Sequence, residues 1–164
     1  MDVEISRDGY VHHDRYERGV PTVELVNGLL PTIGKTKKTG TKINFLPDDT
    51  IFETTIFDFN VLKQRFREMA FLTKGLKIVL KDDREEEPKE RTFHYEGGIK
   101  EFVSYLNRSA TPLYEQIIYC EGMVNNVSVE VAMQHNDSYS DNTYGFVNNI
   151  TTPEGGTHVV GFRN

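Results

Sequence analysis

Strict alternation of apolar and polar positions around residues 127–134 is the feature that most restricts how this chain can fold. Apolar side chains occupy every second position there: Val127, Val129, Val131 and Met133. Because successive side chains of a strand point to opposite faces, this pattern predicts a strand with one apolar face in an antiparallel sheet. Apolar segments at residues 116–120 and 143–150 predict two further strands of the same sheet.

The start of the chain predicts a β-hairpin. Alternating residues flank Asp8-Gly9, one of the strongest two-residue hairpin signals. Residues 22–33 contain glycine and proline and predict a surface loop. Residues 41–45 alternate again and predict the next strand.

An amphipathic helix is predicted in the middle of the chain. Asp58 is a suitable N-cap, apolar side chains recur at helical spacing from Phe59 to Ala70, and Gly75 stops the pattern. We expect a solvated face to carry its basic residues, which are Lys63, Arg65 and Arg67.

The next segments predict a second hairpin and a second helix. Residues 76–80 and 91–95 alternate on either side of a charged tip, and residues 99–107 form a short helical stripe before a linker at residues 109–112. Spacing alone indicates a two-layer α/β protein with a small second domain.

Composition excludes several classes of protein. With 164 residues the chain can bury a core without a disulfide or metal. Cys120 is the only cysteine, which excludes an internal disulfide and a multi-cysteine zinc site, and we expect a half-buried, unreactive thiol. The net charge of -6 argues against autonomous DNA binding.

Neither a membrane segment nor a secretory signal is predicted. No run of about 18 apolar residues occurs, and the first residues lack the basic and apolar regions of a signal peptide. The expected location is the cytoplasm, with no membrane partner.

No catalytic group or metal site emerges from the residues alone. His12 and His13 are adjacent in a predicted strand and so point to opposite faces, which prevents them from sharing one metal. His158 has no identifiable nucleophile. The stretch Lys37-Lys-Thr-Gly-Thr41 lacks the spacing of a phosphate-binding P-loop, and a strand is predicted after it where a P-loop needs a helix.

Several longer blocks, taken in order, carry a resemblance to a known family. They are Tyr16-Glu-Arg-Gly-Val-Pro21, Lys38-Thr-Gly-Thr41, Arg65-Phe-Arg-Glu-Met-Ala-Phe-Leu72, Phe93-His-Tyr-Glu-Gly-Gly-Ile99, Val129-Glu-Val-Ala132, Asn148-Asn-Ile150 and Gly155-Gly-Thr-His158. Essentially the whole chain resembles the family of DNA gyrase B subunits, the ATPase subunits of type IIA topoisomerases. The topoisomerase IV ATPase subunit shares most of these blocks and is the alternative.

The resemblance implies an α+β fold and a domain boundary. Residues 1–98 would be the C-terminal part of a GHKL-type ATPase domain, a two-layer α/β sandwich. Residues 99–164 would be the N-terminal part of the transducer domain, whose fold is similar to domain 2 of ribosomal protein S5. The hinge between the two is expected in residues 99–107 and the linker up to Pro112.

The resemblance also implies a ligand site. Thr41 would lie at the adenine end of an ATP pocket, and Ile43, two residues further along the strand, would face the same slot. Arg7 matches an arginine at the pocket rim that contacts aminocoumarin antibiotics. No catalytic residue and no metal ligand is expected within these residues.

In the family, ATP and Mg²⁺ drive DNA strand passage and negative supercoiling. The partners implied are the A subunit of gyrase and DNA in an A2B2 complex, with ATP-dependent dimerisation of the B subunit. The general-base glutamate, the magnesium-binding asparagine, the adenine box, the glycine-rich lid and the transducer lysine are not found in these residues. This chain is therefore interpreted as an internal fragment that neither hydrolyses ATP nor binds it tightly. A non-catalytic interaction module on the same scaffold is a further alternative.

Overall fold

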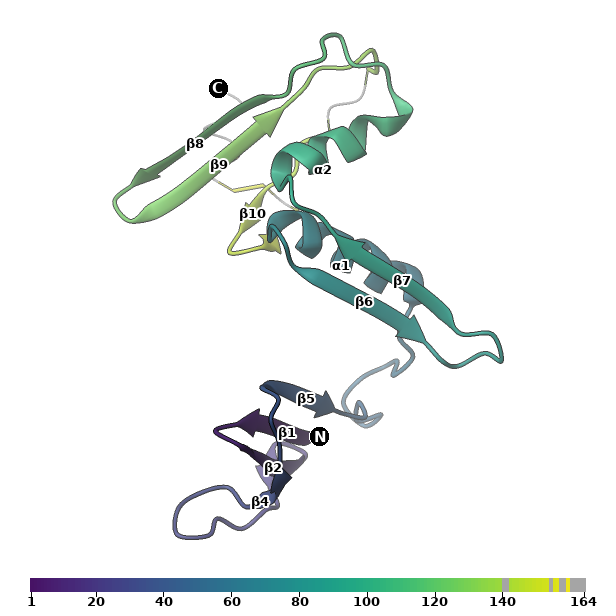
Figure 1. Ribbon diagram of the computed structural model, residues 1–164. Helices are drawn as coiled ribbons and strands as arrows, with labels where there is room; N and C mark the ends of the chain where they lie inside the picture. The colour runs from purple at the N-terminus through teal and green to yellow at the C-terminus, as the bar shows by residue number, and fades with distance from the viewer. Residues whose placement is uncertain (140–141, 154, 157–158, 160–164) are drawn as a thin grey trace. The chain divides into compact units, whose positions relative to one another are not determined.

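A computed structural model describes the chain except for residues 140–141, 154, 157–158 and 160–164. The chain forms two compact units, Met1–Phe57 and Asp58–Asn164, and each is described by itself. Figure 1 shows their helices and strands. The prediction for His158 and for a helical pattern after it lies outside the described residues.

The first unit is an antiparallel sheet. Its order is β3-β2-β1-β5, and β4 also pairs with β2. The strands are β1 (Asp2–Arg7), β2 (Tyr10–Glu17), β3 (Val20–Pro21), β4 (Thr32–Lys35) and β5 (Gly40–Asn44). The central strand β1 is thus flanked by β2 on one side and by β5 on the other.

Tight turns fix the register of this sheet. Asp8 and Gly9 have φ angles of 53° and 84°, the left-handed pair that a two-residue hairpin turn requires, so the predicted hairpin is confirmed. Arg18 and Gly19 repeat this geometry with φ angles of 48° and 81° and join β2 to β3. The sequence did not predict this second hairpin, because arginine is an uncommon residue in such a turn.

The predicted loop over residues 22–33 is wrong at its end. Thr32 already belongs to β4, which pairs with β2 through His12 and Thr32, and the backbone N–H of His13 donates to the carbonyl oxygen of Pro31 over 3.1 Å. These hydrogen bonds come from a strand distant in sequence, so local composition could not indicate them.

In the second unit, a capped helix packs against a hairpin. Helix α1 (Phe59–Leu72) begins where predicted, since the Asp58 carboxylate accepts from the backbone N–H groups of Asn60 and Val61 at 2.7 and 3.0 Å. Strands β6 (Lys77–Asp82) and β7 (Lys89–His94) form the predicted second hairpin. Figure 1 shows this hairpin alongside α1.

After β7, the described part of the second unit contains a short helix, a 3-10 turn and two hairpins. They are α2 (Ile99–Leu106), the 3-10 turn η1 (Asn107–Ser109), β8 (Ile118–Val124), β9 (Val127–Met133), β10 (Phe146–Val147) and β11 (Ile150–Thr151). Strand β9 follows the alternating residues as predicted. A single strand over residues 143–150 is wrong, because Asn148 and Asn149 have φ angles of 49° and 64° and turn the chain into the β10–β11 hairpin. The mixture of helices and antiparallel strands confirms the α+β class.

Aromatic side chains build the core of the second unit. Phe71 is 1% exposed, and its ring stacks on that of Tyr95 with 3.6 Å between centroids. The ring of Phe102 from α2 lies 5.2 Å from that of Phe71. Because α1, α2 and the residue that follows β7 contribute to one aromatic cluster, residues on both sides of position 98 share a core.

Side-chain exposure decides the prediction for the Cys120 thiol. The Cys120 side chain is exposed, so the prediction of a half-buried thiol is wrong. Within the described residues, neither helix has the length and apolar character that crossing a bilayer demands.

A pH effect is expected at the tip of the β6–β7 hairpin. The Arg84 guanidinium donates to both carboxylate oxygens of Asp82 over 2.8 and 2.6 Å and lowers the pKa of Asp82 to about 2. The pKa of an aspartate in an unfolded chain is about 3.9. Because the pKa of Asp82 is lower in the folded chain, the ion pair stabilises the tip at pH values above about 3.9. The stabilisation is lost as the pH falls towards about 2.

This effect can be measured by an NMR titration of the Asp82 carboxyl group. In an Arg84→Gln variant we expect the midpoint to rise towards about 3.9. Lys81→Gln is the control, since the Lys81 ammonium lies 2.8 Å from Asp83 and forms its ion pair there. A midpoint that Arg84→Gln leaves unchanged would show that the guanidinium is not the cause.

Candidate functional site

Strands β1 and β5 place the predicted adenine-site residues side by side with apolar partners. Thr41 lies opposite Ile5, and Ile43 lies opposite Val3. Directly opposed residues of an antiparallel pair project from the same face, and so do residues two apart on one strand. The register therefore gathers Val3, Ile5, Thr41 and Ile43 on one face of the sheet, which we call the β1–β5 face.

Arg7 lies at the end of this face. It is two residues beyond Ile5 on β1, so its side chain leaves the strand on the same side. The guanidinium pairs with Asp8 at 3.5 Å, and the side chain is 77% exposed. The arginine thus lies beside the hairpin turn, at the end of the β1–β5 face.

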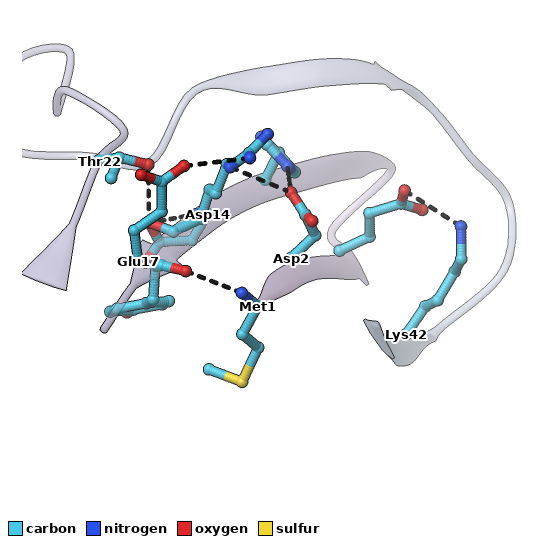
Figure 2. A network of polar contacts seen from close by, with 10 residues as sticks. Met1, Asp2, Asp14, Glu17, Thr22 and Lys42 are labelled. Carbon is cyan, nitrogen blue, oxygen red and sulfur yellow. Dashed lines mark hydrogen bonds and ion pairs between the residues drawn. The ribbon is translucent and has the colours of Figure 1, made fainter. Parts of the chain in front are cut away.

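The opposite face of the same strands is charged and internally paired. Lys42 donates to the Glu4 carboxylate over 3.2 Å, and Asp2 lies 3.5 Å from the His13 ring and 4.0 Å from the Arg15 guanidinium. Figure 2 shows these contacts together with the N-terminal ammonium, which donates to the Tyr16 carbonyl oxygen over 2.8 Å. Satisfied ion pairs suit a solvated surface. The β1–β5 face instead carries branched apolar side chains, with Asp14 and His12 of β2 opposite Val3 and Ile5.

The chemistry of the β1–β5 face suits a flat heterocycle. Branched apolar side chains offer a surface on which a ring can stack, and the Thr41 hydroxyl adds a hydrogen-bonding group. Ile43 is 58% exposed, so this wall is open within the first unit.

The residues next to this face do not form a phosphate cradle. Lys38 donates its backbone N–H to the Thr36 hydroxyl over 3.0 Å in a local turn, and Gly40 then begins strand β5. A P-loop requires a helix after the glycine-rich turn, so the strand agrees with the interpretation from spacing. Among the described residues, no group of three or more histidine, cysteine, aspartate or glutamate side chains is placed to hold a metal ion.

Val3 and Ile5 were missed as members of this face. Their alternation indicated a strand but not its neighbour, because the pairing of β1 with β5 joins segments that are far apart in the chain. Only the register shows that they share a face with Thr41 and Ile43.

Comparison with known proteins gives consistent matches over nearly the whole chain. The family model for DNA gyrase B matches residues 98–164. The chain is 52% identical over 164 residues to the DNA topoisomerase 4 B subunit of Enterococcus faecalis and 51% identical to the DNA gyrase B subunit of Halalkalibacterium halodurans. These matches cover 99% of this chain but 23% and 25% of the relatives, so the chain spans about a quarter of their length.

Solved structures agree with the sequence matches. The 43K ATPase domain of Thermus thermophilus gyrase B, solved in complex with an aminocoumarin, superposes with a TM-score of 0.80 at 34% identity. That match covers 98% of this chain and 43% of the solved chain. The gyrase B subunit of Myxococcus xanthus gives a TM-score of 0.82 at 25% identity, covering 99% of this chain and 46% of the other.

The fold and these matches place the chain in one class of proteins, the B subunits of type IIA DNA topoisomerases. The likeness of this chain to solved gyrase B structures, one of them an ATPase domain, confirms the predicted fold. Within that class, the chain belongs to the family formed by the B subunits of DNA gyrase and topoisomerase IV.

Proposed function

We propose that the intact subunit containing these residues couples ATP binding and hydrolysis to DNA strand passage and negative supercoiling. The observation that carries this proposal is the identity of 51% to a gyrase B subunit over 99% of the chain. ATP and Mg²⁺ are the expected cofactors. The expected partners are the A subunit of gyrase and DNA in an A2B2 complex, in which two B subunits dimerise when ATP binds.

The domain boundary belongs to the same proposal. Residues 1–98 would close the ATPase domain, and residues 99–164 would open the transducer domain. The family match over residues 98–164 and the start of α2 at Ile99 support this division. The compact units divide elsewhere, at Phe57 and Asp58, because α1 and the β6–β7 hairpin pack with later residues.

We assign the adenine end of the ATP site to the β1–β5 face. Thr41 would take part in hydrogen bonding to the base, and Ile43 would pack on the ring. Arg7 would contact an aminocoumarin at the rim. The position of Arg7 at the end of the β1–β5 face and the aminocoumarin complex of the Thermus thermophilus relative support this last role.

Binding by the 164-residue chain alone is expected to be too weak to measure. Phosphoryl transfer depends on metal, lysine and backbone N–H groups around the phosphates and on a carboxylate that orients water. The β1–β5 face supplies only one wall for the base. Titration calorimetry with ATP and Mg²⁺ is the measurement, and micromolar binding would contradict the expectation.

The nucleotide assignment is tested in the intact subunit with Thr41→Val. Valine keeps the shape but removes the hydroxyl, so we expect ATP affinity to fall by about 5- to 30-fold, the usual effect of one lost buried hydrogen bond. Lys42→Met is the matched control, because it breaks the Glu4 ion pair on the opposite face of the same strand. Equal losses in both variants would refute the assignment, and an intact subunit without ATP hydrolysis would refute the function.

Topoisomerase IV remains the second candidate. The identities to the topoisomerase IV and gyrase relatives are nearly equal, at 52% and 51%. An assay of the intact subunit together with its partner separates the two, since a gyrase introduces negative supercoils into relaxed DNA. Relaxation and decatenation without supercoiling would assign topoisomerase IV.

A further inference from the structure

Three lysine side chains at one end of the first unit have no ion-pair partner among the described residues. Lys35 ends β4, and Lys37 and Lys38 lie in the connection that leads to β5. All three are exposed, and within the described part of the chain their ammonium groups form neither an ion pair nor a hydrogen bond. Because like charges this close together repel one another, the group gains free energy when an anion lies beside it.

Most other basic side chains of the described residues already have a partner. The lysines in ion pairs are Lys42 with Glu4, Lys81 with Asp83 and Lys89 with Glu85, over 3.2, 2.8 and 2.6 Å. Arg67 donates a hydrogen bond to the Tyr105 hydroxyl. The chain has 25 acidic and 19 basic residues, so three neighbouring lysines without a carboxylate are not a simple result of its composition.

Backbone hydrogen bonds hold these lysines against the first hairpin turn. The N–H group of Thr36 donates to the carbonyl oxygen of Gly9 over 2.9 Å. The N–H group of Lys38 donates to the Thr36 hydroxyl over 3.0 Å. The connection between β4 and β5 therefore lies beside the Asp8-Gly9 turn, at the same end of the sheet as Arg7.

The register adds an arginine and a tyrosine to the lysines. Tyr10 lies opposite Arg7 on β1 and opposite Lys35 on β4. Directly opposed residues project from the same face, so these three side chains form a row across three strands. Tyr10 is 44% exposed, which leaves its hydroxyl able to donate to an anion.

We call this group the basic end, which consists of Arg7, Tyr10, Lys35, Lys37 and Lys38. Residues 7–10 and 35–39 contain four basic side chains and one acidic side chain. The acidic one is Asp8, whose carboxylate lies 3.5 Å from the Arg7 guanidinium. The charge of Asp8 is thus matched by Arg7, and the three lysines give the basic end its positive charge.

The side chains of the basic end suit a chain of phosphates. Lysine, arginine, threonine and tyrosine are among the residues that usually contact DNA phosphates. A protein partner is usually bound through buried aromatic or apolar anchors, whereas residues 7–10 and 35–39 include one aromatic and no aliphatic side chain. A single phosphate is not enclosed there, because the connection leads into a strand. A polyanion with regularly spaced phosphates fits this surface better.

We propose that the basic end is a contact surface for the phosphate backbone of duplex DNA in the intact subunit. This inference rests on the proposed function, in which the subunit acts on DNA. The net charge of -6 argues against strong binding by the 164-residue chain alone, so the basic end adds to contacts made elsewhere in the complex. It does not read the DNA sequence, because phosphate contacts carry no sequence information.

The test uses the intact subunit with its partner subunit and a duplex DNA probe. Lys35→Gln, Lys37→Gln and Lys38→Gln are combined, and DNA affinity is measured by fluorescence anisotropy over a range of KCl concentrations. Each lost phosphate contact lowers the slope of log affinity against log salt by about 0.9, so we expect the slope to fall by at least about 2. An unchanged slope would overturn the proposal. Arg7 is left unaltered because it is assigned to the ligand site.

A second triple variant with the same loss of charge is the matched control. It combines Lys42→Gln, Lys81→Gln and Lys89→Gln, which remove ammonium groups already paired with carboxylates. Its salt slope should remain that of the unaltered subunit. An equal fall in both triple variants would show that net charge, and not the basic end, sets the salt dependence, and would overturn the proposal.

Two further measurements separate this proposal from its alternatives. If the basic end binds an acidic protein surface instead of DNA, its triple variant will lose assembly with the partner subunit in sedimentation velocity without DNA, and that result would overturn the proposal. ATP hydrolysis without DNA should be unchanged, since none of the three lysines lies in the proposed nucleotide site. Absence of ATP hydrolysis in the unaltered subunit would refute the proposed function, and the salt series alone would then decide whether the basic end contacts DNA.

Discussion

A Phe71→Ala chain is expected to lose about 3–5 kcal/mol of the free energy of unfolding of the second unit, the usual cost of removing a buried phenylalanine ring. Phe71 is the largest fully buried side chain among the described residues, and its ring contacts those of Tyr95 and Phe102. Its removal leaves a cavity between α1, α2 and the end of the β6–β7 hairpin. Such a loss is comparable to a large part of the stability of a typical domain.

Denaturant titration followed by far-ultraviolet circular dichroism measures this loss. Helices α1 and α2, the helices of the described residues, lie in the second unit, so the helical signal reports on that unit. Met69→Ala is the control on the same helix, since Met69 is 42% exposed and its truncation should cost less than about 1 kcal/mol. If both variants unfold at the same denaturant concentration, the aromatic cluster is not the centre of the core.

The second large effect is expected on self-association of the chain. One face of the β8–β9 hairpin is wholly apolar, because the register sets Ile118, Cys120, Gly122 and Val124 opposite Met133, Val131, Val129 and Val127. Most of these apolar side chains are exposed in the 164-residue chain. An exposed patch of this kind promotes association in water.

Val129→Lys should weaken self-association at least about tenfold, because any contact over this face would then bury an unpaired charge. Sedimentation velocity over a range of concentrations is the measurement. Ser128→Lys adds the same charge to the polar face of the same hairpin, and we expect it to leave association unchanged. An equal effect of both lysines would mean that net charge, and not the apolar face, controls association.

The sequence indicated most of the local elements, because their signals lie within a few residues. The Asp8-Gly9 turn, the Asp58 cap and the alternation of residues 127–133 each contain the physical cause of the structure that they form. Signals spread across the chain were less informative. The apolar residues around position 146 are compatible with one strand or with two. The positive φ angles of Asn148 and Asn149 turn the chain there, so the structure has two strands joined in a hairpin.

The family resemblance predicts that Thr41, Ile43 and Arg7 belong to a ligand site, but it did not indicate which residues lie beside them. Val3 and Ile5 join the face only through the register of β1 with β5. Sequence alone determined which segments form strands and helices and which residue types they carry. The tertiary structure decided which strands are neighbours, which residues share a face with Thr41, and that Arg67 contacts the ring and hydroxyl of Tyr105. The reason is that periodicity and caps act through bonds a few residues apart, whereas register and burial depend on contacts between segments distant in the chain.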